Sequence, residues 1–489
     1  YSTGVIFLSI LAGLTSLIPV LLIGIRGVFY SIDPEVMYVG NALSFIKIGQ
    51  IQYIDHPGTP SILLVAFLLW PLRIYAKLIS HTPFVLWAFE HYEIVFFYLR
   101  ILFGGLFSFG VWIFLKAVRL ITKSMIFVFF AWAGLLIFAP TLRLGSGITP
   151  ETVSFLLVAT WLWYLAKFLN NPDMDTIMAL GILSGVALAN KFTNLYVVMA
   201  SILLPNLIKS LNIRQKFVNS IVVAIMALSG FILGTWTIRD KYRFLFDWAI
   251  KLLTSTGIHA GGARVIFDWP SYWQSIITIH HQLPWFWVGI LIILATSIFQ
   301  KKLLPLTAVF IVGVLTFAKY PLTYYQLSNY VVLVFIMSFL LSKFSNLMTV
   351  TLVIFMLPLV KGNVTDYLHS ISAAMVKTEI LERYIEANPA KKATLWEWGR
   401  AKTPAILLTM SPDWHGSIFA GEKKSLNLPA YELFPIPKEK VFDLCWDQLY
   451  IQKVSISSFM DRYPENKLWS YEIPESDDMV LVTSSHCTD

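Results

Sequence analysis

The sequence predicts an all-α polytopic membrane domain followed by a small α/β domain. Of its 489 residues, 57% are hydrophobic and only 13% are charged, and the mean hydropathy is +0.67. A soluble domain normally carries roughly 25% charged residues. Apolar runs of the length that crosses a bilayer, about 20 residues, recur along the chain up to residue 361. These observations indicate an integral membrane protein.

We expect eleven spanning helices. They lie near residues 5–25, 94–118, 125–142, 151–170, 175–190, 192–209, 217–238, 284–300, 303–319, 324–342 and 346–361. The first run is too long for a cleaved signal peptide, so we interpret it as a span. The segment 61–79 is also apolar, but Pro71, Arg73 and Lys77 interrupt it. We expect that segment to lie at the membrane interface or to enter the bilayer only partly.

The orientation follows from the basic residues of the short loops. If the N-terminus is cytoplasmic, one set of loops holds Lys116, Arg119, Lys123, Lys209, Arg214, Lys216, Lys301, Lys302 and Lys343. The acids of those loops are Asp173 and Asp175. All long hydrophilic segments and the C-terminus then fall outside the cytoplasm. We interpret the net charge of +8 as this anchoring and not as a nucleic-acid site.

The composition changes after Gly362, where charged residues and prolines become frequent. The pieces "AILLTM", "KVSIS" and "MVLVTS" are typical of strands, and "AAMVKTEILERYIEA" is typical of an amphipathic helix. We therefore expect a membrane domain at 1–361 and a small extracytoplasmic α/β domain at 362–489. An oxidising compartment permits a disulfide between Cys445 and Cys487. Two cysteines are too few for a zinc-ribbon cluster, which needs about four ligands.

Ionisable residues gather at the predicted outer ends of the spans. The acids are Asp33, Glu35, Asp55 and Glu151, and the bases are Arg100, Arg143, Lys191, Arg239, Arg264 and Lys319. Charges at membrane depth are costly and are functional candidates by default. Cations hold phosphate through charge-assisted hydrogen bonds, and a carboxylate can act as a general base. The set indicates a site for an anionic lipid head group.

Structural roles compete with this interpretation. Arg100 and Arg143 can snorkel to lipid head groups. Asp33 before Pro34 has the pattern of a helix N-cap, and Glu151 likewise stands at a helix start. Capping and catalysis are compatible, so both roles stay open for these acids.

Two histidine-containing clusters are dense enough to suggest a metal. They comprise Glu90, His91 and Glu93, and the pair His280 and His281. No second ligand set at a convincing spacing accompanies either cluster. The histidine pair stands in "HHQLPWFW", which is more typical of an aromatic belt at the membrane interface.

The order of motifs resembles the GT-C glycosyltransferases, especially the protein O-mannosyltransferase and lipid A aminoarabinose transferase branch. The first span is followed by an acid in "DPE", an amphipathic helix ending in "IKIGQ", and then "DHPGTP". That branch commonly has a double proline in the last element, whereas Gly58 stands here in place of the second proline.

Later motifs extend the resemblance over roughly residues 5–341. Arg100 stands where an arginine opens the second span. "ITPETVSFLL" resembles the acid that starts the fourth span, and "GVALANKFTNLYVV" resembles the segment between the fifth and sixth. "FAKYPLTYYQLSNYVVLVF" resembles the lysine and tyrosine of a late outer loop.

The resemblance implies transfer of a monosaccharide from a polyprenyl-phosphate donor to an acceptor hydroxyl of a lipid, glycan or protein. It implies Asp33 as general base, with Glu35 as the second choice. For the donor phosphate it implies Lys191, Arg264, Arg100 and His56, and for acceptor binding or orientation Glu151, Lys319 and Tyr324. GT-C branches differ in their need for a divalent metal, and the sequence indicates no dedicated metal site or other cofactor. The implied location is a bacterial inner membrane, with the site on its outer face.

Three other functions compete. A transporter or flippase would suit many spans, but it should place broken helices near the bilayer midplane and show repeat symmetry, and no matching halves are apparent. A scaffold protein would explain the C-terminal domain but not the charges at the span ends. A polymerase or ligase of whole oligosaccharides usually places its catalytic loop late in the chain. Consumption of a labelled donor separates the transferase from the first two.

Overall fold

The structure is a computed structural model. It describes residues 2–24, 35–52, 54, 58–207, 211–255, 265, 268–299, 307, 310–311, 313–314, 323–343, 346–387, 393–396, 419, 448–452, 468–472 and 479–484. The chain forms two compact units. The first comprises Tyr1–Ile18, Ile54–Leu64 and Arg100–Tyr367, and the second comprises Pro19–Tyr53, Val65–Leu99 and Leu368–Asp489. We describe each unit by itself.

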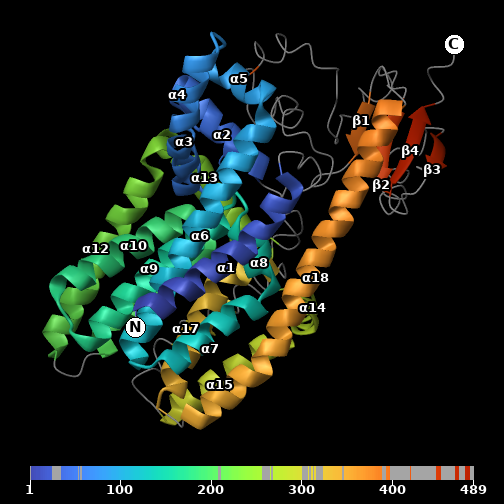
Figure 1. Cartoon of the computed structure of the whole chain (residues 1–489). Helices are drawn as coiled ribbons and strands as arrows, with labels where there is room; N and C mark the ends of the chain where they lie inside the picture. The colour runs from blue at the N-terminus through green and yellow to red at the C-terminus, as the bar shows by residue number, and fades with distance from the viewer. Residues whose placement is uncertain are drawn as a thin grey trace. The chain divides into compact units, whose positions relative to one another are not determined.

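Helices dominate the described part of the chain (Figure 1). In chain order they are α1 (Ser2–Ile23), α2 (Glu35–Ile48), α3 (Thr59–Leu68), α4 (Trp70–Ile79), α5 (Phe84–Glu90), α6 (Tyr92–Thr122), α7 (Met125–Ile137), α8 (Ala139–Gly145), α9 (Pro150–Asn170), α10 (Met174–Asn190), η2 (Phe192–Asn194), α11 (Leu195–Leu203), η3 (Leu204–Leu207), α12 (Ile213–Thr235), η4 (Trp236–Lys241), α13 (Tyr242–Thr254), α14 (Trp269–Gln282), α15 (Pro284–Phe299), η7 (Thr323–Gln326), α17 (Leu327–Leu341) and α18 (Asn346–Ala387).

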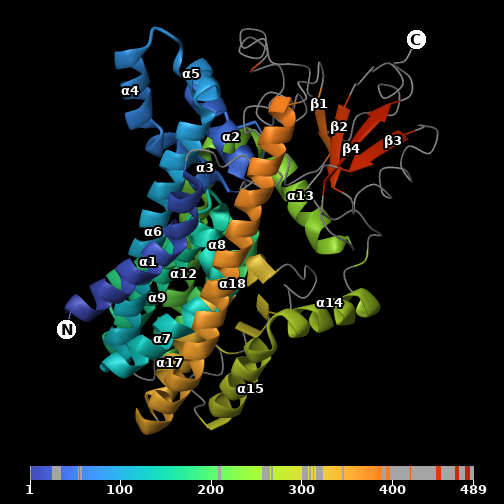
Figure 2. The same ribbon diagram turned by 45° about the vertical axis from the view of Figure 1, so that its right-hand side comes forward.

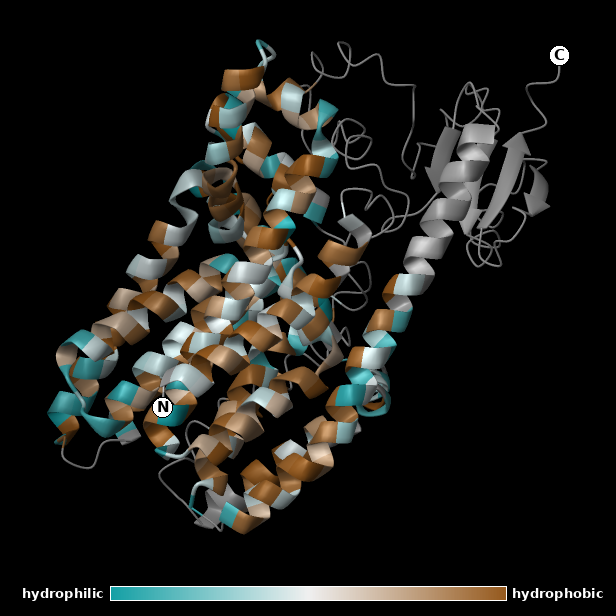
Figure 3. Cartoon of the chain, viewed as in Figure 1, coloured by the Kyte–Doolittle hydropathy of each residue, from teal (hydrophilic) through white to brown (hydrophobic). Residues whose placement is uncertain are grey.

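Within the described residues, five helical segments are long and apolar enough to cross a membrane. They are Thr59–Ile79, Tyr92–Thr122, Pro150–Asn170, Ile213–Thr254 and Asn346–His369. The number rises to seven if each of two bent pairs is one span: Met125–Ile137 with Ala139–Gly145, bent by 80°, and Tyr272–His281 with Phe286–Ala295, bent by 104° (Figure 2). Apolar residues run along these helices (Figure 3). The chain is therefore built as a multi-pass membrane protein.

The apolar helices follow most of the predicted spans. Shorter ones lie at Thr3–Ile18, Met174–Asn190, Phe192–Asn206 and Leu327–Leu341. Most of the predicted span 303–319 lies outside the described residues, so the number of eleven stays a prediction. The segment 61–79, which we expect at the interface, forms α3 and α4 and meets the length and composition criteria for a span.

Helices α10 and α12 pack closely because glycines face each other along the contact. A Cβ atom at Gly185 would lie 1.9 Å from the carbonyl oxygen of Ala227, and one at Gly230 would lie 2.3 Å from that of Ile182. Small residues four apart let two helix backbones approach within a membrane. Gly181, four residues before Gly185, extends the same contact. Both helices belong to the first unit, and this packing holds α10 against α12 there.

The ends of α10 are set by local chemistry. Asp173 is its N-cap, and its carboxylate accepts a hydrogen bond of 2.7 Å from the backbone N–H of Thr176. That bond holds the pKa of the Asp173 carboxyl below its usual value. At the other end, Lys191 is the C-cap with an extended backbone (φ −158°, ψ 126°), so the chain turns there into η2.

The second unit contains a sheet of four described strands in the order β1-β2-β4-β3. The strands are β1 (Ala393–Trp396), β2 (Gln448–Gln452), β3 (Leu468–Glu472) and β4 (Met479–Ser484). Strand β1 pairs with β2 in parallel, and β4 pairs with β2 and β3 antiparallel. The predicted strand "MVLVTS" is β4, whereas "AILLTM" and "KVSIS" lie outside the described residues. Helix α18 runs without a break through the predicted boundary at 361 and includes the predicted amphipathic helix.

Candidate functional site

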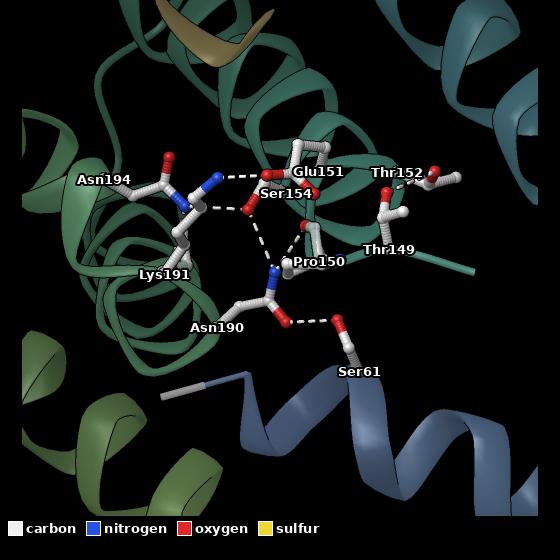
Figure 4. A network of polar contacts seen from close by, with 10 residues as sticks. Ser61, Thr149, Pro150, Glu151, Thr152, Ser154, Asn190, Lys191 and Asn194 are labelled. Atoms are coloured by element: carbon white, nitrogen blue, oxygen red, sulfur yellow. Dashed lines mark hydrogen bonds and ion pairs between the residues drawn. The ribbon is translucent and has the colours of Figure 1, made fainter. Parts of the chain in front are cut away.

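Lys191 and Glu151 form a buried ion pair in the first unit (Figure 4). The Lys191 ammonium donates to the Glu151 carboxylate, and the two side chains are only 13% and 5% exposed. A charge removed from water is costly unless a partner of opposite charge compensates it. The structure therefore brings together two of the ionisable residues that the sequence singled out, 40 positions apart.

Each charge stands at the helix end that favours its sign. Glu151 lies in the first turn of α9, after Thr149 as N-cap and Pro150 at the first helical position. Lys191 follows the last turn of α10. The N-terminal end of a helix carries a partial positive charge and the C-terminal end a partial negative one. The two helix ends thus help to hold the acid and the base in place.

The start of α9 is fixed by a threonine. The Thr152 hydroxyl lies 2.5 Å from the carbonyl oxygen of Leu144 and 3.0 Å from that of Gly147. Thr152 is buried, and the two carbonyls belong to the end of α8 and the turn after it. This hydroxyl therefore anchors the turn that presents Glu151.

A tyrosine from late in the chain covers the lysine. The ammonium nitrogen of Lys191 lies 4.1 Å from the ring centroid of Tyr325, a residue of η7. An aromatic face attracts a cation at this distance. The contact brings η7 (Thr323–Gln326) to the buried ion pair.

The asparagine before the lysine is the centre of a buried polar network (Figure 4). The Asn190 amide nitrogen donates to the carbonyl oxygen of Pro150 at 2.8 Å and to the hydroxyl of Ser154 at 2.9 Å. Its amide oxygen accepts from the hydroxyl of Ser61 at 2.6 Å. The amide of Asn194 also donates to Ser154, at 3.0 Å. The network joins α3, α9, α10 and η2.

Gly58 explains the departure from the double proline. Its φ is +52°, and its backbone N–H donates to the carbonyl oxygen of Asn190 at 3.0 Å. Proline fixes φ near −65° and has no N–H to donate. A proline at position 58 would therefore be incompatible with both features. The start of α3 is tied to the turn at Lys191 through this glycine.

Two atoms beside the network are buried without a hydrogen-bond partner among the described residues. They are the amide oxygen of Asn194 and the hydroxyl of Thr59. In Figure 4 the Asn194 oxygen points away from Ser154. Such groups are rare in folded proteins and commonly mark a place where a water or a ligand group binds.

The other predicted site residues are distributed as follows. Arg100 lies in α6 of the first unit and is 5% exposed. Glu35 begins α2 and is fully buried, in the second unit. Tyr324 lies in η7, and its side chain is outside the described part. Asp33, Asp55, His56, Arg264, Lys319, Cys445 and Cys487 lie outside the described residues. Their roles, and the predicted disulfide, stay predictions.

Among the residues that the structure describes, no group of three or more His, Cys, Asp or Glu side chains is placed to hold a metal ion. In the candidate cluster of Glu90, His91 and Glu93, the ring of His91 stacks on that of Trp87, with the ring centroids 4.6 Å apart. Its Nδ1 lies 2.9 Å from the Trp87 carbonyl oxygen.

Sequence reasoning missed the amides and hydroxyls that surround the ion pair. Asn190, Ser61, Ser154 and Tyr325 were not candidates. A signal was present, because "ALANKFTNLY" places an asparagine one residue before and another three residues after the lysine. Polar side chains in apolar helices commonly bond across to neighbouring helices.

No model of a known protein family matches the chain, and no curated protein matches it. The chain is similar over almost its whole length to a solved structure of ArnT from Cupriavidus metallidurans, a crystal structure bound to undecaprenyl phosphate. The similarity covers 99% of this chain and 98% of that chain, with a TM-score of 0.50 and 11% sequence identity. At this identity the likeness shows the fold.

The chain thus shares its fold with ArnT, a fold that the resemblance of its motifs leads us to expect. Its described helices are those of a multi-pass membrane protein, and the buried Lys191–Glu151 pair is the candidate site within it.

Proposed function

We propose that this protein transfers a monosaccharide from a polyprenyl-phosphate donor to an acceptor hydroxyl at the outer face of the membrane. The observation that carries the proposal is the buried ion pair of Lys191 and Glu151. It belongs to a chain whose fold is similar to that of a protein crystallised with undecaprenyl phosphate. Fold alone does not define a function, so the site must carry the chemistry.

Lys191 is our first choice for the donor phosphate. The bond between the anomeric carbon and the phosphate oxygen breaks during transfer, and its electron pair leaves with the phosphate. A cation at that oxygen stabilises the developing charge. Glu151 holds the ammonium in place when no phosphate is bound. Once the phosphate binds, the ammonium contacts both the Glu151 carboxylate and the phosphate. Arg264, Arg100 and His56 supply the remaining positive charge and hydrogen bonds.

The acceptor hydroxyl needs a base. In our proposal the Asp33 carboxylate takes the hydroxyl proton while the oxygen attacks the anomeric carbon from the side opposite the phosphate. This geometry inverts the configuration of the sugar. Glu35 is the alternative base, and Lys319 and Tyr324 orient the acceptor. The acceptor is a lipid, glycan or protein outside the cytoplasm, where we also place residues 362–489.

The substitution Asp33→Asn tests the base. We expect it to lower the transfer rate by at least about 100-fold, because general-base catalysis contributes about that much or more. The measurement is the turnover of a labelled polyprenyl-phosphate sugar by the purified chain. Asp175→Asn is the matched control, because Asp175 is an exposed acid in the first turn of α10. Wild-type turnover in Asp33→Asn would remove Asp33 as the base.

A transporter or flippase remains the second candidate. The observation in its favour is the 80° bend between α7 and α8, because transporters commonly build their sites from broken helices. A transporter moves its substrate unchanged. The same turnover assay therefore separates the two functions, since only the transferase releases polyprenyl phosphate.

A further inference from the structure

We infer that Asn190 is a positioning residue, which holds residues 58–61, the start of α9 and Lys191 in one fixed arrangement for the donor phosphate. This inference rests on the proposed function. It concerns a residue that touches neither of the reacting groups and acts through Lys191. The evidence is the set of hydrogen bonds that converge on this one side chain and its backbone.

The bonds of Asn190 end on two separate segments, the start of α9 and residues 58–61. Its amide nitrogen donates to the carbonyl oxygen of Pro150, the residue before Glu151, at 2.8 Å. Its backbone oxygen accepts from the N–H of Gly58 at 3.0 Å, and its amide oxygen accepts from Ser61 at 2.6 Å. The next residue in the chain is Lys191. Residues 58–61, the start of α9 and the turn at Lys191 therefore meet at a single residue.

Only an amide side chain can make these contacts. The side chain of Asn190 donates to two oxygens and accepts from one hydroxyl, which uses both ends of the amide. An aspartate would keep the acceptor for Ser61 but would lose both donations, and it would bury a further negative charge beside Glu151. Alanine would lose all three bonds.

Another buried serine supplies a comparison for a merely structural role. Ser201 in α11 accepts a hydrogen bond of 2.8 Å from the indole nitrogen of Trp161 in α9. It is fully buried, and like Ser61 it joins two helices of the first unit. Its hydrogen bonds among the described residues are this one and a donation to the carbonyl oxygen of Val197. Ser201→Ala thus removes a comparable bond away from the ion pair.

The test is a double-mutant cycle on the full chain in detergent, with undecaprenyl phosphate as the probe. The measured quantities are the dissociation constant of the probe and the thermal unfolding midpoint. We expect Ser61→Ala to weaken binding about fivefold, and Asn190→Asp to weaken it more. In the Lys191→Ala background, Ser61→Ala should weaken binding no further, because the serine acts through the lysine. Ser201→Ala should lower the midpoint by a similar amount without changing the dissociation constant.

Either of two results would overturn this inference without contradicting the proposed function. One is wild-type affinity in both Ser61→Ala and Asn190→Asp while Lys191→Ala binds weakly. The other is a fivefold loss that persists in the Lys191→Ala background. Unchanged affinity in Lys191→Ala would contradict the proposed function and the inference with it. If Ser61→Ala does not fold, Asn190→Asp takes its place in the cycle with the same expected outcome.

Discussion

At the scale of single residues, the charge of Lys191 is balanced within the protein before any substrate binds. Glu151 pairs with it and the ring of Tyr325 covers it. Removing one partner of a buried ion pair leaves the other uncompensated, whereas a bound phosphate would supply a new partner. The pair is thus a structural contact, and in the proposed function it is also a binding group for an anion.

The backbone of Gly58 is constrained by its positive φ and by its hydrogen bond to Asn190. We predict the order of stability wild type, Gly58→Asn, Gly58→Ala, Gly58→Pro. Asparagine tolerates a positive φ, alanine costs about 1–2 kcal/mol there, and proline in addition leaves the Asn190 carbonyl without its donor. Thermal unfolding of the four purified chains measures the order.

The asparagine variant serves as the control for this series, because it keeps the N–H and tolerates the left-handed backbone. A proline variant as stable as the alanine variant would contradict the account, since the hydrogen bond to Asn190 would then contribute nothing.

The sequence predicted the members of the ion pair but not the pair itself. Lys191 and Glu151 were each expected at an outer helix end, for different roles. Their contact depends on how α9 packs against α10, which hydropathy does not determine. Asn190 escaped notice because a single amide at a helix end is ordinary in sequence. Its three partners lie between 36 and 129 positions away.

At the scale of elements, the contact of α10 with α12 determines where Lys191 lies. We predict that Gly185→Ala destabilises the chain by at least about 3 kcal/mol, because the new Cβ atom would overlap the Ala227 carbonyl and force the helices apart. Denaturation in detergent, followed by circular dichroism, measures the change.

Gly105→Ala is the matched control for the glycine in the packed contact. Gly105 also lies inside a helix, α6, but a Cβ atom there would meet nothing within 4 Å. The Gly105→Ala substitution should raise the free energy of unfolding by about 0.5–1 kcal/mol. If Gly185→Ala and Gly105→Ala had the same effect on the free energy of unfolding, the glycine contact would not determine the helix packing.

Element boundaries were less predictable than element positions. The change of composition at Gly362 suggested the end of a span, yet α18 continues to Ala387 and even contains Pro358. A glycine inside a helix costs only about 1 kcal/mol, so it does not by itself end one. The segment 61–79 likewise forms a helical pair despite Pro71, because proline is tolerated in the first turn of α4.

At the scale of the whole molecule, the bilayer makes the fold class predictable. Backbone groups in hydrocarbon must be bonded within the segment, so long apolar runs become helices whatever their exact sequence. This explains how 11% identity accompanies a shared fold over 99% of the chain. The sugar and the acceptor of the proposed reaction are under no such constraint, so hydropathy does not identify them.

The central claim is that Lys191 holds the phosphate of a polyprenyl-phosphate lipid. The most direct measurement is an experimental structure of the full chain with undecaprenyl phosphate. We predict a phosphate oxygen within hydrogen-bond distance, about 3 Å, of the Lys191 ammonium. A lipid phosphate bound elsewhere, with Lys191 still paired to Glu151 and covered by Tyr325 as in the present structure, would contradict the claim.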